Sequence, residues 1–340
     1  MIVRLRQLAA ASSRDLLVLL AVVAALALVP LGVSTFTLSV ATAALIFALA
    51  GIGWNVLSGF AGQFSFGHAA YFGLGAYTVA VTFTRYSISP WLGLVLGGLV
   101  AATFGLLTGW ISFRFGLKGA YFALATFALA ELLRLTFNNF DFVGASIGIT
   151  IPLAGGDSWG SLQFEDTPAL RYFVALGLVA LGTLIVIAVT KSRLGSRMLA
   201  VREDEDAAAS LGINPLRAKL FAIAISGFIT ALAGGYYAMF LMFVDSDLAF
   251  GPSISVLILL RPIIGGVGTI WGPVLGAGIL SVLGEVTRSL VRDPPSFLNA
   301  IEGVNGLDQV LFGLILVVVI IRAPDGVIGW FRRFRSRSIT

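Results

Sequence analysis

Residues 16–57 read LLVLLAVVAALALVPLGVSTFTLSVATAALIFALAGIGWNVL, and this stretch decides the fold class. It contains no formally charged side chain, and after Asp15 the next one along the chain is Arg85. One helical crossing of a bilayer takes about 20 predominantly apolar residues, so the uncharged region is long enough for about three crossings. A buried helix of a water-soluble protein does not continue for that length. The stretch therefore predicts membrane-spanning helices.

The composition of the whole chain agrees with a membrane protein. Of its 340 residues, 58% are hydrophobic and only 11% are charged, and the mean hydropathy is +0.98. The 40 glycines suit helices that approach one another closely in lipid. Cysteine is absent, which excludes disulfides and thiolate metal sites. The net charge of +5 comes from short basic runs without an aromatic platform, which argues against nucleic acid as a partner.

Apolar segments follow one another along the chain, which predicts a single transmembrane domain over residues 1–340. The basic start before Leu16 is interpreted as part of a retained first helix, because no small-residue cleavage site follows it. The predicted segments are 16–34, 37–57, 66–84, 91–113, 119–137, 169–190, 217–244, 254–283 and 303–321.

The positions of Lys and Arg predict the orientation of these segments. The N-terminal tail, the loop with Arg114 and Lys118, the segment 191–219 and the C-terminal tail are all basic, so we expect them in the cytoplasm. Residues 138–168 carry acids and no Lys or Arg, so we expect them outside. Both termini are therefore predicted to be cytoplasmic.

Segment 254–283 is the exception to single crossings. Nine single crossings would place the two termini on opposite sides, against the charge pattern. The segment is long and is interrupted by Arg261, Pro262 and the glycine-rich run 265–268, which predicts two short helices that turn there as a re-entrant hairpin. The expected fold is an all-α polytopic membrane protein with about eight crossings plus this hairpin.

A second glycine-rich interruption, SGFAGQFSFGH, covers residues 58–68. Its spacing from Gly59 to Gly62 recurs from Gly265 to Gly268, which an internal two-fold repeat would explain; whether a true repeat exists stays open. Irregular backbone at membrane depth needs protein or water around it, so we expect the two interruptions to lie together on a translocation pathway. The candidate pathway residues are Gly59, Gly62, Gln63, Ser65, His68, Arg261, Gly265, Gly266, Gly268 and Thr269.

Three ionisable positions in the apolar segments have competing interpretations. His68, the single histidine, could be a proton relay, but a neutral ring that hydrogen-bonds the backbone of a broken helix is the favoured reading. Arg261 must pair with an acid or face water, and it could meet a substrate carboxylate. Glu131 and Arg134 lie three apart and are expected to form a local ion pair rather than a substrate contact.

The loop 191–216 is the most informative polar segment. Acids at 203–206 favour a helix N-terminus, the alanines at 207–209 propagate a helix, and Gly212 with Pro215 ends it. We expect a short cytoplasmic helix over 203–213 that docks in a partner's groove, with a solvated connector as the alternative. The apolar residues expected to be exposed on the loop are Leu199, Val201, Leu211 and Ile213.

Three motifs, in order along the chain, resemble one family. Asp206-Ala207-Ala208, followed after three residues by Gly212, is similar to the loop through which bacterial importer permeases dock on ATPase subunits. Residues 59–77 and 265–273 resemble glycine motifs of the branched-chain amino acid permeases of ABC importers, the LivM type in particular. The likeness extends from about residue 40 to 325. Arg261-Pro262 departs from it, since the family usually has apolar residues there, so urea and short-amide permeases remain an alternative.

The resemblance implies a complex in a bacterial inner membrane. It implies a second permease subunit, LivH-like in kind, two cytoplasmic ATPase subunits and a periplasmic solute-binding protein. The residues that it implies for ATPase coupling are Glu205, Asp206, Ala207, Ala208 and Gly212.

The chain is not expected to be an enzyme. It has no Gly-x-x-x-x-Gly-Lys-Ser/Thr phosphate loop, so ATP and Mg²⁺ are assigned to partner subunits, and no cofactor or metal is expected on this chain. A transporter driven by an ion gradient would need acids in mid-span, whereas most acids here lie in loops or near span ends. An intramembrane enzyme would need a deep cluster of His, Asp or Glu, which the apolar segments lack.

Overall fold

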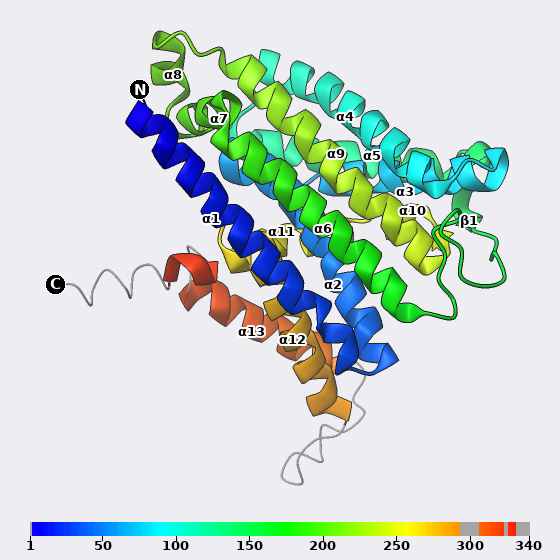
Figure 1. Ribbon diagram of the computed structural model, residues 1–340. Helices are drawn as coiled ribbons and strands as arrows, with labels where there is room; N and C mark the ends of the chain where they lie inside the picture. The colour runs from blue at the N-terminus through cyan, green and yellow to red at the C-terminus, as the bar shows by residue number, and fades with distance from the viewer. Residues whose placement is uncertain (1, 293–305, 323–325, 331–340) are drawn as a thin grey trace.

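The computed structural model describes residues 2–292, 306–322 and 326–330, and it is almost entirely helical (Figure 1). The first helices are α1 (Ile2–Ala27), α2 (Thr35–Trp54), α3 (His68–Tyr86), α4 (Pro90–Arg114), α5 (Gly119–Asn138) and α6 (Pro168–Lys191). The later ones are α7 (Arg193–Glu203), α8 (Glu205–Ser210), α9 (Pro215–Leu241), α10 (Ser246–Phe250), α11 (Pro252–Gly265), α12 (Gly272–Arg292) and α13 (Leu307–Arg322).

Short irregular elements connect the helices. Three are 3₁₀ turns: η1 (Val29–Leu31), η3 (Asp141–Val143) and η4 (Ala145–Ile147). A π-helical turn, η2 (Asn55–Phe60), continues α2. Two short strands, β1 (Ile149–Thr150) and β2 (Phe243–Val244), pair antiparallel with Ile149 opposite Val244.

Seven helical segments of the described residues are long and apolar enough to cross a membrane. This confirms a helical polytopic membrane fold, while the count of eight crossings and the single domain remain predictions. The basic residues of the C-terminal tail lie outside the described residues. The seven segments are Thr35–Phe60, Pro90–Arg114, Gly119–Asn138, Pro168–Lys191, Pro215–Leu241, Ser246–Gly265 and Gly272–Arg292.

The bundle has two distinct ends (Figure 1). The N-terminus, α7 and α8 lie together at one end, which we call the α7–α8 end, and the β1–β2 ribbon lies toward the other. Because α6 is one unbroken helix, residues 138–168 and 191–216 lie at opposite ends of it. That placement agrees with the opposite sides predicted from the charges.

Helix α9 is the centre of the bundle and packs against α2, α3 and α4. Small residues permit the close approach: a side chain at Gly75 would clash with the backbone of Ala231, and one at Gly234 would clash with the backbone of Phe72. Helices packed in lipid associate through such contacts. The glycines seen in the sequence therefore hold the core together.

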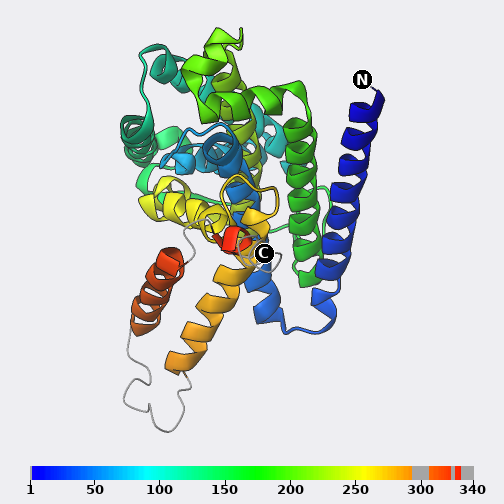
Figure 2. The same ribbon diagram turned by 90° about the vertical axis from the view of Figure 1, so that its left-hand side faces the viewer.

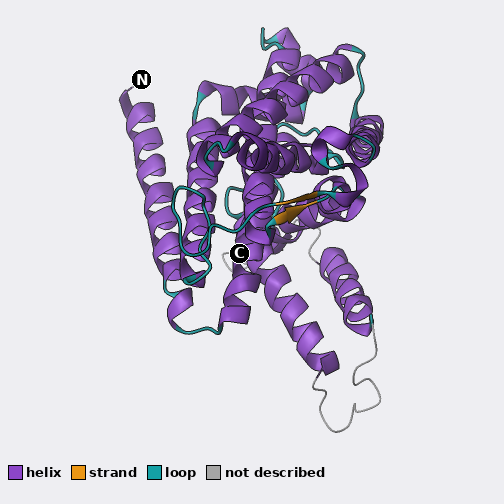
Figure 3. Ribbon diagram, turned by 90° about the vertical axis from the view of Figure 1, so that its right-hand side faces the viewer, coloured by secondary structure: helices purple, strands orange, loops and turns teal. Residues whose placement is uncertain are grey.

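Segment 254–283 contains two helices with a turn at the glycines, as predicted, but each belongs to a segment long enough to cross a membrane, so the re-entrant hairpin remains a prediction. Helix α11 ends at Gly265, α12 begins at Gly272, and the two helices pack against each other and against α2. Helix α12 and the following α13 contact each other and project from one side of the bundle (Figures 2 and 3). The glycine-rich residues 265–272 thus form the turn between α11 and α12.

Candidate functional site

The two glycine-rich interruptions meet in space, as predicted. The Asn55 side-chain amide donates to the Thr269 carbonyl at 2.8 Å, and its oxygen accepts from the Gly268 N–H at 2.8 Å. One side chain of η2 therefore satisfies the backbone of the α11–α12 turn. We call residues 55–62 together with 265–272 the glycine junction.

Glycine is required at the junction for two physical reasons. A side chain at Gly59 would clash with Asn55 and would lie 2.7 Å from the Gly268 nitrogen. Gly62 and Gly268 adopt left-handed conformations, with φ of +70° and +72°, which other L-residues rarely adopt. Equivalent positions of the two motifs share this conformation, which is the outcome that an internal repeat would give; the repeat itself stays an open alternative.

The chain from Gln63 to His68 is held by buried hydrogen bonds. The Trp54 indole donates to the Ser65 carbonyl at 2.8 Å, and the Ser58 hydroxyl donates to the Gln63 carbonyl at 3.0 Å. Gln63 and Ser65 are themselves buried, so these two candidates stabilise the loop and do not line an open channel in this state.

His68 lies at the start of α3 and is completely buried. One ring nitrogen lies 2.8 Å from the Ser226 hydroxyl of α9, and the other lies 3.1 Å from the Ser65 hydroxyl. This geometry agrees with a hydrogen-bonded structural role, but the partners are hydroxyl groups rather than the expected backbone groups. The ring joins α3 to α9 beside the glycine junction.

Arg202, on the last turn of α7, links the polar loop to the junction. Its guanidinium donates to the Gly59 carbonyl at 2.7 Å. A Cβ at Gly268 would lie 2.6 Å from the same guanidinium nitrogen, and a Cβ at Gly62 would lie 2.9 Å from the Arg202 Cγ. Arg202 therefore touches both glycine motifs. An arginine in a basic loop gives no local signal of so distant a contact, so this role of Arg202 was not predicted from the sequence.

The expected helix over 203–213 is shorter than predicted. Asp204 has an extended backbone, so α7 ends before it and α8 begins after it. The Asp204 carboxylate accepts from the Asp206 and Ala207 N–H groups at 2.9 Å, which is an N-cap and not a first-turn position. Gly212 has a φ of +80°, the left-handed conformation expected for the residue that ends this helix.

Ala208, one of the residues that the resemblance implied for ATPase coupling, does not lie on the exposed face of α8. Ala208 is 2% exposed and packs against Val201 and Ala218 inside the chain, so it cannot be the docking surface. Val201, expected to be exposed, is buried for the same reason, and Ile213 is partly buried against this cluster. The exposed residues of the loop include Leu199, Asp206, Ala207 and Leu211, of which Leu211 is 82% exposed.

Glu205 fastens α8 to the bundle. Its carboxylate lies 2.8 Å from the ammonium of Lys219, at the start of α9, and 2.9 Å from that of Lys118, just before α5. Burial of Glu205 opposes its ionisation, but the hydrogen bonds from the two lysines outweigh this effect and hold its pKa below the ordinary value. The same hydrogen bond raises the pKa of Lys118.

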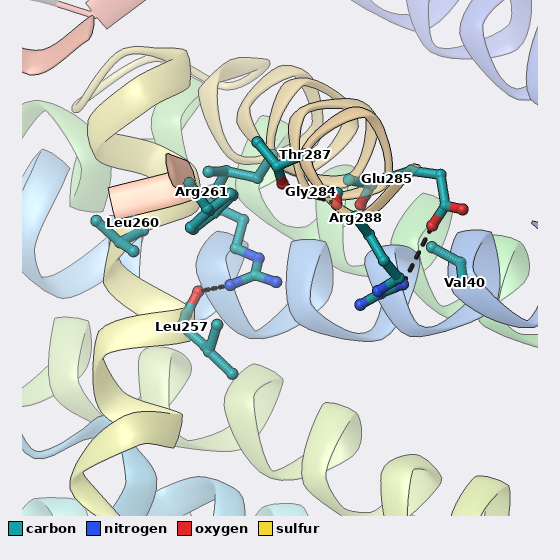
Figure 4. Close-up of a pocket in the computed structure, with 11 residues that line it drawn as sticks. Val40, Leu257, Leu260, Arg261, Gly284, Glu285, Thr287 and Arg288 are labelled. Atoms are coloured by element: carbon teal, nitrogen blue, oxygen red, sulfur yellow. Dashed lines mark hydrogen bonds and ion pairs between the residues drawn. The ribbon is translucent and has the colours of Figure 1, made fainter. Parts of the chain in front are cut away.

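Arg261 lies on α11 with its guanidinium 4.6 Å from the centre of the Phe47 ring. One nitrogen donates to the Leu257 carbonyl (Figure 4), and the Nε atom has no hydrogen-bond partner within residues 2–292, 306–322 and 326–330. No ion pair joins Arg261 to an acid in the described part of the chain, contrary to one expected alternative. Glu131 and Arg134 do form the predicted ion pair, at 2.6 Å, and Arg134 also bonds Asp247 at 2.7 Å.

Comparisons with known proteins agree with the geometry. Residues 36–320 match a family model described as branched-chain amino acid transport system / permease component. The permease LivM of the high-affinity branched-chain amino acid transport system of Escherichia coli (strain K12) is 31% identical over 320 residues, which covers 88% of this chain and 71% of LivM. The permease LivH of Salmonella typhimurium (strain LT2) is 22% identical, over 83% of this chain and 91% of LivH. No solved structure matches this chain.

Fold and comparison together define a helical membrane transport subunit and not an enzyme. The chain belongs to the family of branched-chain amino acid transport permeases, as a permease component.

Proposed function

We propose that this chain carries branched-chain amino acids across a bacterial inner membrane as one of two permease subunits of an ABC importer. The observation that supports this most strongly is the hydrogen bond from Arg202 to Gly59. This hydrogen bond joins the polar loop 191–216, the proposed docking site of the ATPases, to the glycine junction. Such a link is what an importer driven by a separate motor subunit requires.

In this proposal, the α7–α8 end of the bundle faces the cytoplasm and both termini lie there. The two ATPase subunits, with their ATP and Mg²⁺, contact the exposed face of α8, and a periplasmic binding protein delivers the solute at the opposite end. The chain then has eight crossings plus the α11–α12 hairpin. The second permease subunit resembles LivH, since LivH itself is a relative of this chain.

Coupling follows from how α8 is attached. Glu205 ties α8 to Lys219 on α9 and to Lys118 between α4 and α5, while Arg202 ties α7 to the glycine junction. Movement of α8 by a closing ATPase pair is therefore transmitted to α9 and to the Gly59 carbonyl. The junction opens when the Arg202 and Asn55 hydrogen bonds are rearranged.

The test uses substitutions on the exposed face of the loop. Leu211→Asp and Ala207→Arg add charge where the partner docks but leave the buried Ala208 cluster intact. We expect the complete transporter, reconstituted in liposomes, to lose at least tenfold in ATP-driven leucine uptake. Co-purification of the ATPases with the permease is expected to weaken by a similar factor.

Leu153→Asp provides the control, because Leu153 is 64% exposed and lies in the segment 138–168 at the other end of α6. It should leave ATPase co-purification unchanged. Normal ATPase binding and uptake by both loop variants would identify the loop as a solvated connector. Uptake of urea or acetamide in place of leucine by the wild-type complex would refute the substrate assignment.

A further inference from the structure

A pocket of about 280 Å³ lies between α2, α11, α12 and α13, and Arg261 forms part of its wall (Figure 4). We call it the Arg261 pocket. Its volume is near the lower end of the range for small-molecule sites, about 300 to 1,000 Å³. The polar groups on its wall include Ser281, Glu285, Thr287 and Arg288, and the apolar ones include Val40 and Phe312. A pocket with both charges and an apolar wall suits a small amphipathic zwitterion.

The guanidinium of Arg261 is the unusual feature of this pocket. The residue is 8% exposed, its Nε has no hydrogen-bond partner among the described residues, and its hydrogen bond goes to the neutral Leu257 carbonyl. Figure 4 shows the guanidinium extending into the pocket. A buried cation without a counter-ion is costly, on the order of several kcal/mol. The planar guanidinium presents donors in the geometry that a carboxylate accepts.

Glu285 supplies the opposite charge in the same pocket. It pairs with Arg288, one turn along α12, at 3.1 Å, and both side chains are about half exposed. An exposed pair of this kind contributes little to stability, about 0 to 1 kcal/mol, so the carboxylate can exchange its partner at small cost. The pocket thus offers a buried group for an anion and an accessible group for an ammonium.

The position of the pocket along α2 relates it to the glycine junction. Val40 of α2 lines the pocket, whereas Asn55 holds the junction 15 positions further along, which corresponds to about 22 Å of helix. The junction is hydrogen-bonded to Arg202 on the last turn of α7, so it lies toward the α7–α8 end, and on α11 it begins at Gly265, four positions after Arg261. A solute in the pocket would therefore be stopped by the junction before it reached that end.

We propose that the Arg261 pocket binds the transported amino acid, with its carboxylate on Arg261, its ammonium on Glu285 and its apolar side chain against Val40 and Phe312. This inference rests on the proposed amino acid transport and names the group that contacts the substrate. An oxyanion beside an ammonium also occurs in the phosphatidylethanolamine headgroup. The free amino acid is the better occupant because the whole molecule fits within about 280 Å³. The acyl chains of a lipid do not fit in this volume.

The first arm of the test measures binding to the assembled transporter in phosphatidylcholine nanodiscs without the binding protein. Radiolabelled leucine should be retained, and leucinamide, which lacks the carboxylate, should compete at least tenfold more weakly than leucine. Arg261→Gln should weaken leucine binding at least tenfold, Arg261→Lys less, and Glu285→Gln a few-fold. Arg114→Gln is the control and should have no effect, because Arg114 lies beside Trp110 at the C-terminal end of α4, which does not line the pocket.

The second arm separates the possible failures. Leucine uptake by the wild type with equal uptake by Arg261→Gln would overturn the pocket assignment and leave the proposed function standing. Wild-type uptake of another solute class would refute the proposed function instead. Native mass spectrometry of complexes from ethanolamine lipid should show no lipid retained through Arg261. Retention by the wild type, loss in Arg261→Gln and no leucine binding would identify a lipid site and overturn the proposal.

Discussion

The glycine junction and the Arg261 pocket both rest on α2, yet they are built in opposite ways. At the junction, Asn55 uses both ends of its amide on the α11–α12 turn, and the glycines leave no space for a side chain. At the pocket, Arg261 lines about 280 Å³ of space, and its inaccessible Nε has no hydrogen-bond partner among the described residues. The difference separates two tasks: a closed contact can act as a gate, and an open charged pocket can act as a binding site.

The two arginines show the same contrast. Arg202 is partly exposed and gives a hydrogen bond to a backbone carbonyl, so its partner can be exchanged for water when α7 moves. Arg261 is buried, and its charge meets no acid among the described residues, so an anion that entered the pocket would supply the missing counter-charge. One arginine is therefore suited to transmit movement and the other to hold an anion.

Gly59→Ala should have the largest effect, because it places a methyl group inside the close contact between Gly59 and the α11–α12 turn. The added methyl group would clash with Asn55 and press on the Gly268 nitrogen. We expect leucine uptake to fall at least 100-fold, with a lower thermal midpoint in detergent. Gly177→Ala, in α6, is the matched control because a Cβ there meets nothing within 4 Å. Equal activity of the two variants would show that the junction is not a tight contact.

Glu205→Gln should have a smaller effect, confined to the loop 191–216 that contains α8. Removing the carboxylate leaves Lys219, whose side chain is 3% exposed, without its counter-charge, at a cost of about 3 kcal/mol. We expect amide hydrogen exchange in α8 to speed up and uptake to fall a few-fold. Glu203→Gln is the control, since Glu203 is 73% exposed and lies 4.0 Å from Arg202.

The pH dependence of this contact follows from the lowered pKa of Glu205. A depressed folded-state pKa gives stabilisation that is complete above the unfolded value, about 4.3, and is lost as the pH falls through the folded value. The protection factors of the α8 amides, relative to their intrinsic exchange rates at each pH, should therefore stay constant from pH 8 to about 5 and fall below about 4.3. An α8 that loosens between pH 8 and 6 would contradict the two-lysine contact.

Glu165→Cys should have the smallest effect on transport and tests the orientation. Glu165 is exposed in the segment 138–168, and the chain has no cysteine of its own. An impermeant thiol reagent is expected to label it from outside in intact cells with uptake unchanged. Labelling only after the membrane is opened would reverse the assignment of the two ends.

Local patterns in the sequence were enough to predict several features of the fold. Apolar length located the membrane helices, the glycines at 265–268 predicted the turn between α11 and α12, and Gly212 predicted the left-handed end of α8. Each of these is a local rule of hydrophobicity or backbone conformation. The meeting of the two glycine motifs was also predicted, from the requirement that broken backbone be covered.

Features that depend on distant packing were predicted less well. Ala208 was expected on the surface, but its contacts with Val201 and Ala218 exist only once α7, α8 and α9 have packed. Arg202 was missed because its partner, Gly59, is 143 positions away. The arrangement of side chains around the site therefore required the structure, and the roles assigned to the candidate residues remain predictions.

The most direct test of coupling through the junction compares ATP hydrolysis with uptake in Arg202 variants of the reconstituted complex. Arg202→Ala removes the bond to Gly59, and Arg202→Lys keeps the charge but not the planar guanidinium. We predict normal ATPase assembly and ATP hydrolysis with at least a tenfold loss of leucine uptake for Arg202→Ala, and an intermediate loss for Arg202→Lys. Uptake that stays in constant proportion to ATP hydrolysis in both variants would contradict this account.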